Sequence, residues 1–274
     1  MLFTALRRAA SRAILLLLFV WLGGGAAFAA SPPCPAPGRL VFETERQIRR
    51  SDVGFTEGLE IHNGALYEST GDFVGHSQVN RIDLATGQVT VLVDAGRRYF
   101  GEGLTIFSGR IYQMTWREHQ VFVFDLEGRR LQRLHNPREG WGLTHDSARL
   151  IASDGSDKIF FLSPDDFSTL DSLTVRLGAD PVPRLNELEY VDNVIYANVF
   201  EDWRVLRISS LTGCVEAVAD LSGLLDQMRP ADQRRVAFDR NFVLNGIAHD
   251  PRTGQFVITG KDWPVLFVGR FRPA

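Results

Sequence analysis

A hairpin-sized segment recurs five times along the chain, and this repeat limits the folds that the sequence can adopt. Each copy has an apolar anchor and a second apolar anchor seven residues later, or nine residues later in the last copy. Turn residues such as Asn-Gly and Ser-Gly lie between the anchors. The copies span 56–71, 101–116, 141–155, 186–200 and 245–261. Two apolar runs around such a turn predict a pair of antiparallel strands.

The spacing of the copies predicts the architecture. Equivalent positions lie 45, 39, 45 and 59 residues apart, and further strand-like runs fill the intervals. Repeats of about 40–50 residues with four strands each are typical of β-propeller blades. The last repeat is one strand short, and the run at 39–48 can supply that edge. We therefore predict an all-β fold, a five-bladed β-propeller closed by an N-terminal strand, with a helix or loop inserted at 222–238.

The N-terminus has the pattern of an export signal. Basic residues precede a short apolar run and an Ala-rich cleavage site, which predicts a signal peptide at 1–30. A signal anchor is the alternative interpretation. The remaining residues, 31–274, are predicted to form a single domain. The mature protein is then expected in the periplasm or outside the cell.

The charge and cysteine content exclude several classes of function. The chain has 30 basic and 33 acidic residues, a balance that disfavours nucleic acid and membrane surfaces as partners. Its two cysteines, Cys34 and Cys214, lack the neighbouring Cys or His residues of a zinc site. In an oxidising compartment they could form a disulfide. A neutral small molecule or a peptide is the better-matched ligand.

The repeat alignment predicts two rings of side chains at one mouth of a central channel. A hairpin places the start of its first strand and the end of its second strand at the same end. The first ring contains Glu57, Glu102, Trp141, Asn186 and Asn245. The second ring contains Gly71, Trp116, Gly155, Phe200 and Lys261. Any one of these residues alone is typical of a solvated surface or of packing, but together they predict a functional cavity.

The residues in these rings belong to motifs that resemble a known family. In order, the motifs are "FTEGL", "LYESTG", "FGEGLT", "GWGLT", "SDGS", "LNELEY", "ANV", "LNGIA" and "TGKDWP". They resemble the plant-type and bacterial glutaminyl-peptide cyclotransferases over residues 50–268. The resemblance implies a five-bladed propeller that cyclises an N-terminal glutamine to pyroglutamate and releases ammonia. It also implies no relation to the zinc-dependent animal enzymes.

The resemblance assigns roles to residues of this chain. It implies that Glu102 is the catalytic acid, that Trp116 and Trp141 contact the substrate, and that Asn186 and Lys261 belong to the site. Two positions depart from the family pattern. This chain has Glu57 where the family usually has Gln, and Phe200 where the family often has Trp. The expected substrate-binding residues are therefore Trp116, Trp141, Phe200, Glu57 and Asn245. A carboxylate at position 57 near Glu102 would raise one of their two pKa values unless Lys261 or a bound cation compensates.

The expected mechanism needs no organic cofactor. Glu102 would accept the proton of the substrate α-amine and return it to the departing ammonia. Asn186 and Lys261 would stabilise the negative oxygen of the tetrahedral intermediate, while the aromatic residues exclude water. The expected partner is a peptide or protein N-terminus that begins with glutamine, and a monomer is expected.

Two alternatives from other classes remain open. The altered positions Glu57 and Phe200 are compatible with a propeller that binds a ligand without chemistry. Carboxylates and amides around a channel are also compatible with a calcium-dependent hydrolase or a structural calcium site. The candidate calcium ligands are Glu57, Glu102, Asn186, Asn245 and Asp154.

Overall fold

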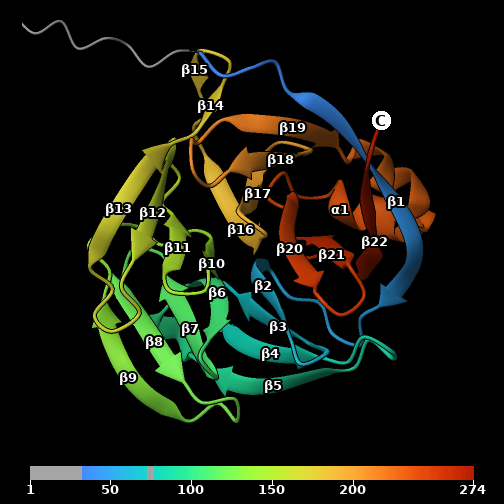
Figure 1. Cartoon of the computed structure of the whole chain (residues 1–274). Helices are drawn as coiled ribbons and strands as arrows, with labels where there is room; N and C mark the ends of the chain where they lie inside the picture. The colour runs from blue at the N-terminus through green and yellow to red at the C-terminus, as the bar shows by residue number, and fades with distance from the viewer. Residues whose placement is uncertain (1–32, 73, 75–76) are drawn as a thin grey trace, which may run out of the picture. The chain divides into compact units, whose positions relative to one another are not determined.

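Residues 33–72, 74 and 77–274 are described by a computed structural model, and their architecture is all-β (Figure 1). The predicted signal peptide lies outside these described residues. Residues 33–274 form one compact unit. In the described part of the chain, no helix is long and apolar enough to cross a membrane.

The strands form successive antiparallel sheets in chain order. The first sheet contains β2 (Thr56–His62), β3 (Ala65–Thr70), β4 (Gln78–Ile82) and β5 (Val89–Asp94). The second contains β6 (Gly101–Phe107), β7 (Arg110–Thr115), β8 (Gln120–Phe124) and β9 (Arg130–His135). The third contains β10 (Leu143–His145), β11 (Leu150–Ser153), β12 (Lys158–Leu162) and β13 (Thr169–Thr174). A two-stranded hairpin follows as β14 (Arg176–Leu177) and β15 (Asp180–Pro181).

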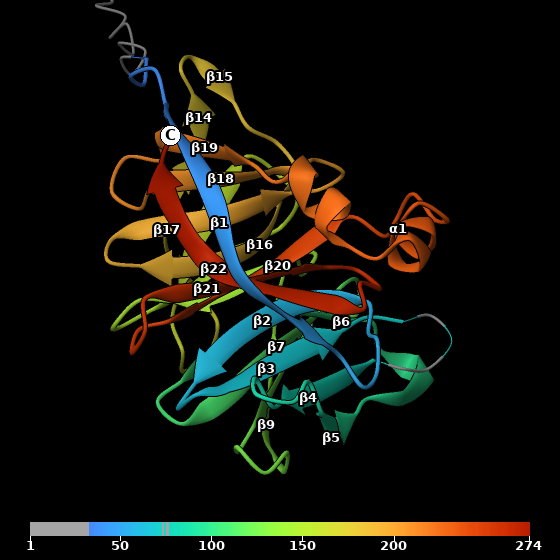
Figure 2. The same cartoon turned by 90° about the vertical axis from the view of Figure 1, so that its right-hand side faces the viewer.

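A larger sheet joins the two ends of the described chain. Its members are β16 (Leu185–Val191), β17 (Val194–Val199), β18 (Arg204–Ser209), β19 (Val215–Asp220), β1 (Gly38–Arg49), β22 (Val265–Pro273), β21 (Gln255–Gly260) and β20 (Leu244–Asp250). Strand β1 pairs antiparallel with β22 and, over a short stretch, parallel with β19. Figure 2 shows β1 running alongside β22. The predicted closing role of the N-terminal run is confirmed.

The first strand of each repeat lies innermost. Strand β2 contacts β6 and β20, β10 contacts β6 and β16, and β16 contacts β20, so these strands surround a common centre. Figure 1 shows this arrangement. The predicted apolar anchors Leu59, Leu104, Leu143, Leu188 and Ile247 are all fully buried. Burial of such side chains stabilises the fold by about 1.5–3 kcal/mol each.

The predicted insertion at 222–238 is a short helical segment. It contains the 3-10 helix η2 (Ser222–Gln227) and the helix α1 (Pro230–Val236). Pro230 stands at the start of α1, where its missing N–H costs no helical hydrogen bond. Leu224 and Val236 bury against the neighbouring strands. Another 3-10 turn, η1 (Gly96–Arg98), connects β5 to β6.

Candidate active site

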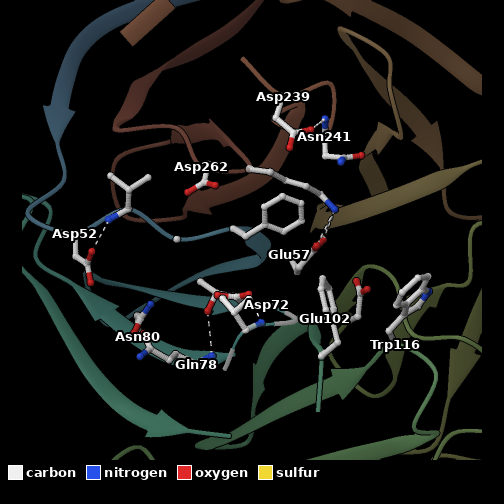
Figure 3. Close-up of a pocket in the computed structure, with 18 of the residues that line it drawn as sticks. Asp52, Glu57, Asp72, Gln78, Asn80, Glu102, Trp116, Asp239, Asn241 and Asp262 are labelled. Atoms are coloured by element: carbon white, nitrogen blue, oxygen red, sulfur yellow. Dashed lines mark hydrogen bonds and ion pairs between the residues drawn. The ribbon is translucent and has the colours of Figure 1, made fainter. Parts of the chain in front are cut away.

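A cavity of about 780 Å³ opens at the end of the innermost strands where the two predicted rings meet. Seven of the eight predicted catalytic and substrate-binding residues line it: Glu57, Glu102, Trp116, Trp141, Asn186, Phe200 and Lys261. Figure 3 shows Glu57, Glu102 and Trp116 on one part of its wall. The repeat alignment therefore predicted side chains that the fold brings together.

Asn245 and Asp154 are placed differently. Asn245 is buried, and its side-chain N–H groups donate to the Thr56 carbonyl at 2.9 Å and to Glu57 Oε2 at 3.4 Å. It is absent from the residues that line the cavity, so its direct contact with substrate stays a prediction. Asp154 does not line the cavity either and accepts hydrogen bonds from the backbone and side chain of Ser156.

A shared irregularity of the inner strands presents the ring residues. The register of strand pairing shifts between Thr56 and Gly58, and equivalent shifts surround the other three ring residues on β6, β16 and β20. Glu57, Glu102, Asn186 and Asn245 each lie inside such a bulge. A β-bulge turns a side chain out of the regular alternation and is frequent beside active sites.

Glu57 and Lys261 form a buried ion pair. The Lys261 ammonium lies 2.6 Å from Glu57 Oε2 and donates a hydrogen bond to Oε1 at 2.7 Å. Glu57 is 1% exposed and Lys261 is 6% exposed. The ammonium also lies 4.9 Å from the centre of the Phe55 ring and 5.3 Å from that of Phe200. Burial raises the pKa of Glu57 above its ordinary value of 4.5, whereas the charge and the hydrogen bond of Lys261 lower it and favour the ionised carboxylate.

Glu102 is a buried acid whose pKa is raised well above its ordinary value of 4.5. Burial is the main cause, because removal from water disfavours the charged form. The negative charge of Glu57 raises the pKa further, and Lys261 lowers it. Glu118 and Glu139 add smaller contributions that raise it. Such a group holds a proton at pH values where an ordinary carboxyl is ionised, which suits a residue that gives and accepts a proton in turn.

Aromatic rings form much of the cavity wall. The rings of Trp141 and Phe200 meet edge to face, with centroids 5.7 Å apart. Those of Phe100 and Trp116 are 5.6 Å apart, and Phe100 also packs against Phe55. The sequence interpretation missed Phe55 and Phe100. A signal for them was present, because each stands two residues before a ring glutamate in "FTEGL" and "FGEGL".

Two charged residues, Glu139 and Arg117, hold Trp116 in its orientation. Its indole N–H donates to Glu139 Oε2 at 3.0 Å, and Arg117 donates to the other oxygen of Glu139 at 3.0 Å. The Arg117 guanidinium lies 3.9 Å from the centre of the Trp116 ring, within range of a cation–π contact. Arg117 and Glu139 lie outside the repeat pattern, so no sequence signal identified them.

Among the charged residues that line the cavity, six are acidic and two are basic. Asp52, Asp72, Asp239 and Asp262 stand around the two glutamates (Figure 3). The basic lining residues are Arg50 and Lys261, and each is paired with a buried glutamate. Carboxylates around a cavity attract a cationic group such as a peptide α-ammonium.

The described residues contain no group of three or more His, Cys, Asp or Glu side chains arranged to hold a metal ion. Cys34 and Cys214, whose pairing the sequence left open, form a disulfide with Cα atoms 5.4 Å apart.

Comparisons with known proteins agree on one family. The family model described as glutamine cyclotransferase matches residues 19–271. The protein named glutaminyl-peptide cyclotransferase of Arabidopsis thaliana is 36% identical over 225 residues, and the match covers 80% of this chain and 68% of the plant protein.

Solved structures agree with this relationship. The crystal structure of Myxococcus xanthus glutaminyl cyclase superposes with a TM-score of 0.75 at 34% identity, over 87% of this chain and 99% of that chain. The WD40 β-propeller domain of Doa1 gives a TM-score of 0.50 at 10% identity, over 84% of this chain and 96% of that chain. The latter likeness concerns the propeller-like fold alone.

Proposed function

The chain belongs to the glutamine cyclotransferase family, and we propose that it carries out its glutaminyl-peptide cyclotransferase reaction in the acidic, aromatic-walled cavity, with Glu102 as general base and acid. This activity converts an N-terminal glutamine of a peptide to pyroglutamate and releases ammonia. The observation that carries the assignment to Glu102 is a buried carboxyl with a raised pKa on the cavity wall.

The reaction joins the substrate α-amine to its own side-chain carboxamide. The neutral amine nitrogen attacks the carboxamide carbon, and Glu102 accepts the proton that the amine loses. Glu102 then donates this proton to the carboxamide nitrogen as the bond to that nitrogen breaks and ammonia leaves. An α-amine has a pKa of about 7.7–8.0, so a carboxyl with a raised pKa is better matched to both transfers.

Other cavity residues would assist these two steps. Asn186 and Lys261 are the candidate donors to the negative oxygen of the tetrahedral intermediate. Trp116, Trp141 and Phe200 would hold the glutamine side chain folded back toward its amine and would exclude water. No organic cofactor is required by this chemistry.

The fold that supports this site is proposed to be a five-bladed propeller. The larger sheet then counts as two blades, β16–β19 and β20–β22, which β1 joins by pairing with both. The ring of contacts among the five inner strands supports this count.

The proposed location of the enzyme is the periplasm or the extracellular space, and its proposed state is a monomer. The Cys34–Cys214 disulfide supports export, because structural disulfides persist mainly in oxidising compartments.

Substitution of Glu102 by Gln tests the catalytic assignment. We expect kcat on a glutamine-initiated tripeptide to fall by about 10²–10⁴-fold, because an amide of the same shape cannot transfer the proton. Ammonia release is the measurement, and thermal melting verifies folding. Exposed Glu127, away from the cavity, provides the matched Glu-to-Gln control. Wild-type turnover by a folded Glu102→Gln variant would refute the role.

The same assay separates the alternatives. Ammonia release that persists in a chelator supports the metal-independent cyclase. Release that stops in the chelator and returns with calcium supports the calcium-dependent interpretation. An absence of release from glutamine-initiated peptides supports a binding module.

A further inference from the structure

Glu57 directs its carboxylate at a cavity lysine. Both of its oxygens bond the Lys261 ammonium, at 2.6 and 2.7 Å, and its Oε2 also accepts from Asn245 at 3.4 Å. A buried ion pair gains little net stability over apolar residues of similar volume, because both charges lose their hydration. Its occurrence in a catalytic cavity therefore suggests a role in the chemistry.

We propose that Glu57 is a positioning residue, which holds the Lys261 ammonium toward the substrate and places a negative charge beside Glu102. The sequence interpretation had assigned Glu57 to substrate contact. The new role depends on the proposed function of the cavity, and it gives this chain a device for setting the pH range of its reaction.

The geometry of the lysine supports the first part of the proposal. An ammonium has three N–H donors, and the two Glu57 oxygens can accept two of them. The rings of Phe55 and Phe200 lie 4.9 and 5.3 Å from the nitrogen. These contacts restrict a flexible side chain to one place and leave one N–H for a substrate oxygen. Without Glu57, the Lys261 ammonium would be free to bond the Glu102 carboxylate. That bond would hold Glu102 in its ionised form and hinder its proton transfers.

The charges around Glu102 support the second part. The groups that act on this carboxyl are Glu57 on β2, Lys261 after β21, Glu118 after β7 and Glu139 after β9. Glu57 raises the pKa of Glu102, and Lys261 lowers it. Loss of the Glu57 charge alone leaves Lys261 uncompensated. The pKa of Glu102 must then fall.

A double-mutant cycle with Glu57→Gln and Lys261→Met tests the proposal. In the free enzyme Glu102 accepts a proton as carboxylate, so kcat/KM declines as the pH drops below its pKa. Glu57→Gln should move this acidic limb to lower pH by about one unit or more. It should also lower kcat by about tenfold, with a smaller change in KM. Lys261→Met should move the limb to higher pH.

Non-additivity is the decisive expected result. If Glu57 acts through Lys261, the double variant should lose no more kcat than Lys261→Met alone. Glu57→Gln alone leaves a buried lysine without a partner and could prevent folding. The double variant carries neither charge, so it still allows Glu57 to be tested in that case. Glu60→Gln is the matched control, since Glu60 is another buried glutamate of β2 and is not among the groups that most affect the pKa of Glu102. This control should keep the wild-type acidic limb.

One pattern would overturn the proposal. If Glu57→Gln raises KM equally with and without Lys261, and the acidic limb stays in place, then Glu57 contacts the substrate directly. The result for Glu102→Gln separates this failure from that of the proposed function. Wild-type turnover by Glu102→Gln would refute the acid and base role of Glu102. The coupling between Glu57 and Lys261 in kcat would remain measurable in that case.

Discussion

Three buried glutamates join inner strands that belong to different repeats. Glu187 on β16 accepts the backbone N–H of Leu59 on β2 at 3.1 Å and that of Ile247 on β20 at 2.8 Å. Glu189 accepts the N–H of His249 at 3.0 Å. Glu60 on β2 accepts the Thr105 hydroxyl of β6 at 2.9 Å. Single carboxyl groups thus satisfy the polar groups of inner strands that have no ladder partner on that side.

At the scale of the single residue, we predict that Glu60 makes the free energy of unfolding depend on pH. Burial raises its pKa from 4.5 to about 7, and the charge of His145 opposes this effect. A raised folded-state pKa contributes stability that is present below 4.5 and is lost as the pH rises through about 7. The loss corresponds to about 3 kcal/mol.

Urea unfolding of the wild type and Glu60→Gln at about pH 4 and about pH 8 measures this effect. The wild type should lose about 3 kcal/mol relative to the variant over this range. A Glu127→Gln control, at an exposed position, should track the wild type. A constant difference between wild type and Glu60→Gln would contradict the prediction.

At the scale of the strand, glycines let the inner strands approach closely behind the ring residues. A Cβ on Gly103 would lie 2.4 Å from both the backbone nitrogen of Leu143 and the carbonyl oxygen of Trp141. One on Gly58 would lie 2.4 Å from the backbone nitrogen of Leu104. The Gly103 N–H donates to the Trp141 carbonyl at 2.7 Å across this contact. The glycines beside Glu57 and Glu102 are therefore required by strand packing at the centre.

We expect Gly103→Ala to lower the free energy of unfolding by about 2 kcal/mol or more, because backbone atoms cannot move aside as side chains can. Thermal and urea unfolding provide the measurement. Gly223 in η2 is the matched control, since an added Cβ there meets no atom within 4 Å. If both variants unfold like the wild type, the close approach is less restrictive than the structure indicates.

At the scale of the whole described unit, the N-terminal strand and the disulfide act together. Strand β1 completes the sheet that contains β22, and Cys34, just before β1, bonds Cys214, just before β19. The two cysteines are 180 residues apart in the sequence. A link over so long a segment removes much of the conformational freedom of the unfolded chain.

The paired substitution Cys34→Ser and Cys214→Ser should therefore cost about 2–5 kcal/mol of stability. Melting with and without a reducing agent measures it. The reductant should lower the melting temperature of the wild type toward that of the variant and leave the variant unchanged. Equal melting of variant and oxidised wild type would show that the disulfide is not needed to hold β1.

The sequence predicted more of the fold than of the cavity. The hairpins, the closing strand and the buried anchors followed from apolar periodicity, because a strand in a packed sheet must alternate its faces and end at a turn. The strand β13 has a weak sequence signal, since exposed polar residues dominate it. Eight of the residues that line the cavity followed from comparing equivalent positions of the repeats. Phe55 could have been found in that way, but Asp239 lies between the inserted segment and the last repeat copy, where no equivalent position exists for comparison.

Local pattern and repeat spacing were enough to predict the repeated hairpins, their order and seven of the eight candidate site residues as cavity residues, because these depend on neighbours in the sequence. The partners of the charged groups depended on the folded chain. Glu57 meets Lys261 across a separation of 204 residues, and Glu187 reaches across to β2 and β20. Such contacts are set by how twisted sheets meet around a centre and by the cost of burying charge without a partner. No periodicity in the sequence encodes either quantity.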